Sequence, residues 1–207
     1  PHRAGRRHPV RVLVAVTPDR LRRLWRGVVA SVLLGCGVGA VLATEIDPVT
    51  SKVGFTLTTR WGHELIGQFP DPRGEIIELP GGRHRVHLQL ATASVEIVDH
   101  PSYTRFTRGS GFFDAADYPR VDFLSDAYDT ALLRKGGPLT GMLTIRNVRR
   151  REMFTISPAG CDVPARDCDV VATGTIHRGD YGMGRWNVAL SDQVRFALRV
   201  RVRGPGR

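Results

Sequence analysis

Strict alternation of apolar and polar residues near the end of the chain constrains the fold more than any other feature. The run VRFALRVRV, residues 194–202, places valine, phenylalanine or leucine at every second position and mostly arginine between them. Successive side chains of a β-strand point to opposite faces, so this pattern predicts a strand with one buried face. Shorter alternating runs occur at 53–58 and 86–91.

Further strand-like segments recur along the chain, separated by Gly, Pro, Asp and Asn, which are typical of turns. Arg146-Asn147 is expected to form a two-residue hairpin turn, because asparagine tolerates positive φ. The one helical segment expected is 99–108, where Pro101 suits an early position. These features predict an all-β, antiparallel, eight-stranded barrel or sandwich. The further strand candidates are Leu65–Phe69, Gly74–Leu79, Val121–Ala127, Leu139–Ile145, Glu152–Ile156 and Val170–Ile176.

Positive charge is concentrated at the start of the chain. Residues 1–43 hold eight arginines and one acidic residue, whereas the remainder holds 22 basic and 19 acidic residues. The arginine-rich stretch is followed by the uncharged segment Gly27–Ala43. A basic region, a short apolar region and small residues before a cleavage point are typical of a secretory signal. We expect residues 1–43 to be a leader cut after Ala43, 44–203 to form the folded domain, and 204–207 to be a tail.

Two alternatives to cleavage after Ala43 stay open. The apolar segment would be an uncleaved anchor, although it is shorter than the ~20 residues of a comfortable membrane span. Alternatively, LLGC at 33–36 resembles a bacterial lipobox, in which Cys36 would carry a lipid.

The remaining two cysteines, Cys161 and Cys168, lie across a short proline-containing loop. An even pair of this kind predicts a disulfide in an oxidising compartment.

The motifs of common enzyme classes are missing from the sequence. It has no G-x-S-x-G, no H-E-x-x-H and no phosphate-binding G-K-S or G-K-T. His84 and His87 are three residues apart, which places them on opposite faces of a strand and disfavours a metal site. No basic patch is interleaved with aromatic residues, as in many nucleic-acid-binding domains. We therefore predict a protein that is not an enzyme, holds no metal or cofactor of its own and does not bind nucleic acid.

The inward-facing rows of the expected strands are rich in phenylalanine and leucine. A small barrel either fills its interior with such side chains or encloses one ligand, and alternation alone does not decide between a filled core and an apolar pocket. The residues in these rows are Phe55, Leu57, Phe69, Phe123, Leu143, Ile145, Phe154, Ile176 and Phe196.

Six stretches, in order along the chain, together resemble the YceI-like family. The chain departs from the family pattern at Gly111, where aspartate is common, at Arg146-Asn147, which replaces His-Gly, and at His177, which replaces asparagine. The matching stretches are TEIDPVTSKVGFTL (44–57), LIGQFPDPRGEI (65–76), SGFFDAADYPRVDF (110–123), LTIRNV (143–148), TGTIHRGDYGM (173–183) and LSDQVRFAL (190–198).

This resemblance implies an extended, lipocalin-like antiparallel β-barrel exported to the bacterial periplasm. It also implies an apolar tunnel that holds a polyisoprenoid chain, such as a quinone tail or an analogue, for carriage or sequestration. Arg105, Arg108 and Tyr181 are candidates for the tunnel mouth, the alternative being that the arginines are solvated surface residues. The nine inward-facing residues above are then expected to line the tunnel together with Phe112, Phe113 and Met183.

The adjacent pair Phe112 and Phe113 is expected to enter a strand near one end of the barrel. Neighbouring residues of a strand face opposite sides, so one ring would line the tunnel. The other would pack under the 99–108 segment or Tyr118-Pro119. The alternative in which both rings are structural plugs stays open.

Two other functions stay open at this point. One is an envelope stress or structural module with a side-chain-filled barrel and a surface for a protein partner. The other is an enzyme acting on a lipid or quinone, which would need polar side chains such as His100, Asp180 or Tyr181 to converge at the mouth. The sequence leaves the identity of the lipid and the formation of a homodimer undecided.

Overall fold

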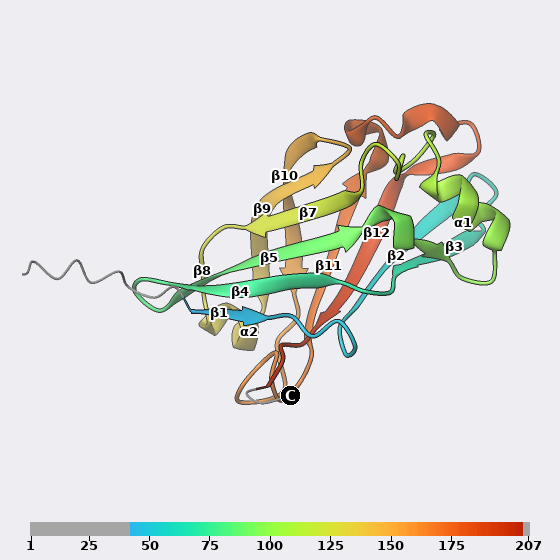
Figure 1. The fold of residues 1–207 in the computed structure, drawn as a ribbon. Helices are drawn as coiled ribbons and strands as arrows, with labels where there is room; N and C mark the ends of the chain where they lie inside the picture. The colour runs from blue at the N-terminus through green and yellow to red at the C-terminus, as the bar shows by residue number, and fades with distance from the viewer. Residues whose placement is uncertain (1–41, 205–207) are drawn as a thin grey trace, which may run out of the picture. The chain divides into compact units, whose positions relative to one another are not determined.

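The computed structural model describes residues 42–204. In this part of the chain, twelve β-strands form one antiparallel sheet, accompanied by two short α-helices (Figure 1). The predicted leader and tail lie almost entirely outside the described residues. The strands are β1 (Ala43–Glu45), β2 (Lys52–Thr59), β3 (Glu64–Phe69), β4 (Arg73–Leu79), β5 (Arg83–Ala91), β6 (Glu96–Ile97), β7 (Arg120–Ser125), β8 (Tyr128–Asp129), β9 (Gly137–Ile145), β10 (Val148–Ile156), β11 (Val170–His177) and β12 (Leu190–Val200).

The sheet curls into a barrel. Its strands follow the order β1-β4-β5-β7-β9-β10-β11-β12-β2-β3-β6, and β8 pairs with β5. An antiparallel bridge between Ile46 and Val202 links the β1 end of this order back to the end of β12. The predicted all-β antiparallel barrel is confirmed. The described residues contain nine strands of six or more residues rather than eight, because each segment with strand-like patterning forms a separate strand.

The alternation at the end of the chain produces the expected two-faced strand. In β12, Val194, Phe196 and Leu198 are buried, whereas Arg195, Ala197 and Arg199, which alternate with them, are exposed. The same inward apolar face recurs in β2 and β9. Burial of these rows removes apolar surface from water, which is the main favourable term in folding.

The β9–β10 hairpin turns at the predicted residues. Ile145 pairs with Val148 across the turn, and Arg146 and Asn147 both have positive φ, at 49° and 61°. Two-residue hairpin turns of this type require positive φ at both central positions. The prediction of a direct β9–β10 pairing is confirmed.

Two α-helices lie at opposite ends of the barrel (Figure 1). The helix α1 (Pro101–Arg108) falls in the expected segment, with Pro101 in its first turn. The helix α2 (Ala131–Lys135) was not expected, because five residues are too few to show a helical period. No helix within residues 42–204 is long and apolar enough to cross a membrane.

The loop 157–169 between β10 and β11, here called the disulfide loop, is closed by a disulfide between Cys161 and Cys168. The backbone N–H of Ala165 in this loop donates a hydrogen bond to the carbonyl of Cys168, and the N–H of Val202 donates to the carbonyl of Ala165. Ala165 is buried, with only 3 % of its surface exposed. The disulfide therefore constrains a loop that packs into one end of the barrel.

Replacing both cysteines by serine is expected to lower the free energy of unfolding. The two residues are seven positions apart, and closing a loop of this length in the unfolded chain is worth about 2–3 kcal/mol in the chain-entropy model. Urea denaturation of the double variant Cys161→Ser/Cys168→Ser measures the loss. Wild-type protein with its disulfide reduced is the matched control and should unfold at the same urea concentration as the variant. Equal stability of the variant and the oxidised wild type would contradict the prediction.

Candidate ligand-binding site

An apolar cavity of about 80 Å³, here called the inner cavity, lies inside the barrel. Eight long strands contribute to its lining, because their inward positions all point to the same space. Among the lining residues, only Tyr128 carries a polar side-chain atom. They are Ile46, Val53, Ile76, Val86, Leu88, Leu90, Val121, Phe123, Tyr128, Leu133, Leu139, Leu143, Phe154, Ile156, Ala165, Val170, Ala172, Phe196, Leu198 and Val200.

Two glycines make room for the rings of Phe123 and Phe154 in the lining of the inner cavity. A Cβ atom at Gly141 would lie 2.6 Å from Cζ of Phe123, and one at Gly174 would lie 2.6 Å from Cδ1 of Phe154. Both distances are too short for a side chain at either glycine. The rings of Phe123 and Phe154 meet edge to face, with centroids 5.0 Å apart, a favourable aromatic arrangement. The glycines therefore let both rings lie back against the barrel wall.

A second apolar cavity of about 30 Å³ lies towards α1 and is here called the α1-side cavity. Of the residues described, Phe196 alone lines both cavities, so its ring forms the partition between them. The residues that line the α1-side cavity are Phe55, Leu57, Thr107, Phe112, Phe113, Ile145, Ile176, Arg178, Met183, Val194 and Phe196.

The structure places the twelve predicted tunnel residues in and around these two cavities. All twelve are buried. Phe69 lines neither cavity, but its ring centroid lies 5.8 Å from that of Phe55 and 5.6 Å from that of Phe113. Those lining the inner cavity are Phe123, Leu143, Phe154 and Phe196, and those lining the α1-side cavity are Phe55, Leu57, Phe112, Phe113, Ile145, Ile176, Met183 and Phe196.

Phe112 and Phe113 lie in a turn between α1 and β7, so their expected entry into a strand is wrong. The N–H of Phe113 donates to the carbonyl of Thr107, which folds the chain back on α1 before β7 begins. A turn does not send neighbours to opposite faces, so both rings line the α1-side cavity. Phe113 meets Phe55 edge to face, and Phe112 packs against Phe106 of α1.

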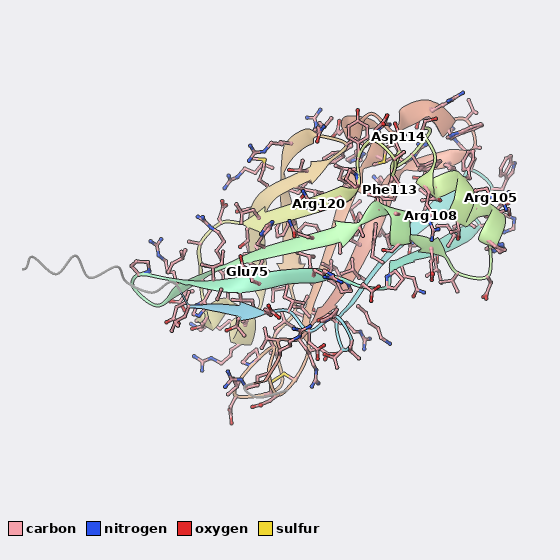
Figure 2. All side chains as sticks on the ribbon, viewed as in Figure 1. Glu75, Arg105, Arg108, Phe113, Asp114 and Arg120 are labelled. Carbon is pink, nitrogen blue, oxygen red and sulfur yellow. A yellow bond between two sulfur atoms is a disulfide. The ribbon has the colours of Figure 1, made fainter. Side chains whose placement is uncertain are left out.

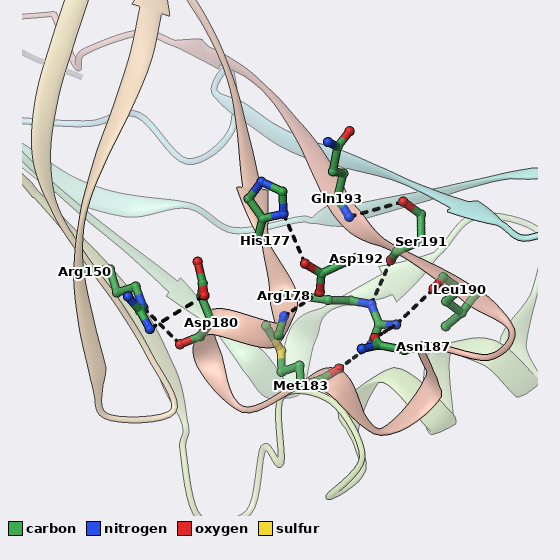
Figure 3. Close-up of polar contacts among 11 residues, drawn as sticks. Arg150, His177, Arg178, Asp180, Met183, Asn187, Leu190, Ser191, Asp192 and Gln193 are labelled. Atoms are coloured by element: carbon green, nitrogen blue, oxygen red, sulfur yellow. Dashed lines mark hydrogen bonds and ion pairs between the residues drawn. The ribbon is translucent and has the colours of Figure 1, made fainter.

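A buried arginine, Arg178, lines the α1-side cavity, and Figure 3 shows its polar contacts. Arg178 is 1 % exposed, and its guanidinium lies 5.7 Å from the ring centroid of Phe112. Burial lowers the pKa of Arg178 from its ordinary value, and the charge of Asp192 opposes this shift. Its hydrogen-bond acceptors are the carbonyls of Ser191, Met183 and Leu190 and Oδ1 of Asn187.

Arg178 was not among the site residues predicted from the sequence, although it lies in the family motif TGTIHRGDYGM at 173–183. An arginine in a turn normally faces solvent, and no local pattern shows that four acceptors surround it. Many lining residues of the inner cavity, such as Val53, Leu88 and Leu198, were visible as alternating apolar positions but were not assigned to the site.

The three candidates for the tunnel mouth do not surround an opening. Tyr181 is completely buried, and its hydroxyl donates a 2.7 Å hydrogen bond to Oε1 of Glu152. Burial, followed by this hydrogen bond, raises the pKa of Tyr181. Arg105 and Arg108 lie on α1 (Figure 2) and line neither apolar cavity; Nε of Arg108 donates to the carbonyl of Val95.

An open polar pocket of about 360 Å³ lies against the inner cavity, at the end of the barrel that carries α2 and the disulfide loop. Ile76, Tyr128, Leu133 and Ala165 line both the polar pocket and the inner cavity. They therefore form the boundary that a molecule would cross between the two spaces. The other residues lining the polar pocket are Leu42, Thr44, Glu78, His84, Thr130, Arg134, Asp162, Val163, Pro164, Arg166 and Val202.

Comparison with known proteins gives one family and a consistent fold. The family model for the YceI-like domain matches residues 45–202. A comparison with curated proteins finds no match. Among solved structures, BcnA of Burkholderia cenocepacia has a TM-score of 0.63 at 20 % identity, covering 77 % of this chain and 99 % of its own.

Two further structures have the same fold. A polyisoprenoid-binding domain from Saccharophagus degradans has a TM-score of 0.59 at 13 % identity, covering 80 % of this chain and 99 % of its own. The YceI protein of Campylobacter jejuni has a TM-score of 0.54 at 21 % identity, covering 67 % of this chain and 84 % of its own. At these identities the likeness establishes a shared fold.

Proposed function

The chain belongs to the YceI-like family, and on this basis we propose that it is an exported protein whose barrel binds a polyisoprenoid chain for carriage or sequestration. The observation that carries the proposal is the inner cavity, whose lining contains no polar side-chain atom except that of Tyr128 among the residues described. Such a space suits a hydrocarbon chain, because burial of apolar surface is favourable without directional contacts. The polyisoprenoid-binding domain with the same fold supports the proposal.

The size of the cavities indicates how a chain would be held. The inner cavity has about 80 Å³, which at roughly 10–15 Å³ for each water-sized group is room for about five to eight CH₂ groups. Their burial contributes roughly 4–6 kcal/mol, whereas association costs about 4–15 kcal/mol. Useful affinity therefore requires the chain to extend past Phe196 into the α1-side cavity, or a polar head group that adds binding energy.

Export is supported by two features of the sequence and structure. The basic, then apolar, order of residues 1–43 is typical of a secretory signal, and the disulfide between Cys161 and Cys168 is of a kind that persists in oxidising compartments. Together they support a periplasmic location. An N-terminal anchor, or a lipid on Cys36, would place the same domain at the membrane.

A catalytic role has no comparable support among the described residues. Tyr181 bonds to Glu152, Asp180 pairs with Arg150, and the ring of His100 lies against that of Tyr103. Each of the three candidates for catalysis thus has a different partner and none lines either apolar cavity. We therefore propose a binding protein and not an enzyme.

Native mass spectrometry of the protein exported by a bacterial host, followed by organic extraction, tests the function directly. We expect a bound species that extracts as an isoprenoid lipid. A protein that is detected at its bare mass, and stays bare after incubation with a benzoquinone carrying a four-isoprene tail, would contradict lipid binding and favour the structural module with a filled barrel.

Filling the inner cavity should weaken ligand binding while preserving the fold. Ala172 on β11 lines the inner cavity, so Ala172→Phe is expected to weaken binding of the four-isoprene benzoquinone at least ~10-fold, at a stability cost of about 1–3 kcal/mol. Ala197 on β12 is exposed, so Ala197→Phe is the matched control and should bind as the wild type does. Titration followed by native mass spectrometry measures both. Unchanged binding by Ala172→Phe would show that the ligand lies elsewhere.

A further inference from the structure

Exposed apolar side chains gather at the α1 end of the barrel. Six of the eleven large hydrophobic residues that are exposed in the described chain lie in three segments that meet at this end: 60–66, 98–108 and 184–189 (Figure 1). Trp61 is 73 % exposed and Val188 is 83 % exposed. Exposed apolar residues that cluster in this way mark an interaction site. The six residues are Trp61, Ile66, Val98, Tyr103, Phe106 and Val188.

The three segments form one continuous surface, here called the arginine–aromatic patch. Nε of Arg60 donates a 3.0 Å hydrogen bond to the carbonyl of Asn187, which joins the turn after β2 to the loop before β12. The ring centroid of Phe106 on α1 lies 4.8 Å from that of Trp186 in the same loop. The chain that leads into α1 is held against β3, because β6 pairs with β3.

Gly111 makes room for Trp186 in this patch. A Cβ atom at position 111 would lie 2.7 Å from Nε1 of Trp186, so a side chain there would displace the indole. With glycine present, the indole packs against Phe106, and the guanidinium of Arg185 lies 5.9 Å from the indole centroid. The glycine that departs from the family pattern therefore allows an aromatic ring to join the patch.

Each of the three segments places an arginine directly before an aromatic residue. The pairs are Arg60-Trp61, Arg105-Phe106 and Arg185-Trp186. All three arginines are exposed, and none forms an ion pair with another residue of the described chain. The stem of an arginine can lie along apolar surface while its guanidinium stays in a polar layer, and a guanidinium binds phosphate oxygens in a bidentate manner. The pairs are therefore suited to a surface that is apolar below and phosphate-rich above.

The patch also carries an excess of positive charge. Segments 60–66, 98–108 and 184–189 hold four arginines and only two acidic residues, and one of these acids, Glu64, is paired with Arg195. At the opposite end of the barrel, the lining of the polar pocket contains two arginines and two carboxylates. An anionic surface is therefore attracted to the α1 end more strongly than to the other end.

We infer that the arginine–aromatic patch docks on the surface of an anionic lipid bilayer. The exposed aromatic and aliphatic side chains enter the interface, where tryptophan and tyrosine are favoured, and the arginines bind lipid phosphates. Buried apolar area and attraction to anionic lipids together determine the strength of such binding. This inference goes beyond the proposed function and does not depend on a ligand inside the barrel.

Flotation with lipid vesicles tests the inference on the exported protein. One set of vesicles is phosphatidylcholine alone, and the other mixes it with an equal part of phosphatidylglycerol, which is anionic. We expect the protein to float with the anionic vesicles and much less with the neutral ones. Binding should weaken as sodium chloride is added, because salt screens exposed charges.

Two double variants remove the apolar and the charged contributions separately. Burial of a large apolar side chain corresponds to about 10-fold or more in affinity, so Trp61→Ser/Val188→Ser should weaken binding to anionic vesicles at least ~10-fold. One basic residue near an anionic surface corresponds to about 5-fold, so Arg105→Gln/Arg185→Gln should weaken it by about this factor for each arginine.

Each double variant has a matched control away from the patch. Leu124→Ser/Met153→Ser removes two exposed apolar side chains from β7 and β10. Arg134→Gln/Arg166→Gln removes two exposed arginines from α2 and the disulfide loop. Both controls should float as the wild type does.

Quenching of tryptophan fluorescence by brominated phosphatidylglycerol gives a second measurement that is local to the patch. Residues 1–43 are the same in all variants, so a difference between the wild type and Trp61→Phe belongs to Trp61. We expect less quenching in Trp61→Phe, because the indole at position 61 enters the bilayer in the wild type.

Three results would overturn the inference. The first is equal flotation of the patch variants and their controls together with equal quenching in Trp61→Phe and the wild type. The second is equal affinity for neutral and anionic vesicles. The third is a protein that ignores vesicles but forms a dimer that Trp61→Ser/Val188→Ser dissociates. Since aromatic residues and arginine are also frequent in protein interfaces, that result would assign the patch to a second copy of the chain.

Discussion

Arg178→Met is expected to lower the free energy of unfolding by about 3–5 kcal/mol, the range found when one partner of a buried, hydrogen-bonded charge is removed. Arg178 is 1 % exposed, and its guanidinium donates to four acceptors in the segment 183–191. Methionine fills a similar volume but leaves these acceptors without a donor, and each unsatisfied buried group costs about 1–3 kcal/mol. The net loss stays below the sum of these costs for two reasons. The loop relaxes in part, and the variant no longer buries the positive charge of Arg178.

Urea denaturation measures this loss, with Arg150→Met as the matched control. Arg150 is about half exposed, with 49 % of its side chain accessible, and forms a surface ion pair with Asp180 (Figure 3). Exposed ion pairs contribute about 0–1 kcal/mol, so this variant should remain close to the wild type. A loss below ~1 kcal/mol for Arg178→Met would show that water or the loop backbone satisfies the four acceptors.

Phe196→Ala is expected to cost about 3–5 kcal/mol of stability and to change which tails the barrel accepts. The ring of Phe196 packs 5.8 Å from that of Phe55 and forms the partition between the inner cavity and the α1-side cavity. Its removal leaves a void that the surrounding strands fill only in part. The same void joins the two cavities into one longer apolar space.

A chain-length comparison tests the second effect. We expect the ratio of affinities for benzoquinones with two-isoprene and one-isoprene tails to rise in Phe196→Ala. Phe154→Ala is the matched control, because Phe154 is about equally buried but lines the inner cavity alone. It should lose similar stability without the change in length preference. Equal ratios in the two variants would mean that Phe196 does not limit the length of the ligand.

The regular parts of this fold could be predicted from the sequence because their cause is local. Alternation in residues 194–202 fixes which side chains of β12 are buried, and the positive φ that Asn147 tolerates fixes the β9–β10 hairpin. The family motifs then indicated an apolar interior. The buried phenylalanines on strands, Phe55, Phe123, Phe154 and Phe196, follow from alternation, whereas Phe112 and Phe113 lie in a turn that alternation does not predict.

The remaining parts depend on contacts between distant segments, which no local pattern reveals. The polar pocket combines residues from β1, β4, β5, β8, α2 and the disulfide loop, so its position could not be read from spacing. Arg178 and Tyr181 have polar side chains in a turn, and only tertiary packing buries them. For the same reason, the mouth predicted at Arg105 and Arg108 falls at the α1 end, whereas the open pocket borders the inner cavity at the other end.

The two ends of the folded domain meet at one place. Leu42, where the described chain begins, and Val202, close to its end, both line the polar pocket. Anything covalently attached to either end, whether a membrane tether or a fused partner, is therefore held within linker reach of the polar pocket. The effective concentration of the attached group at the polar pocket would be set by the length of the linker and not by the affinity of that group for the domain. Under the proposed function, ligand exchange would then be fastest with whatever surface the chain is tied to.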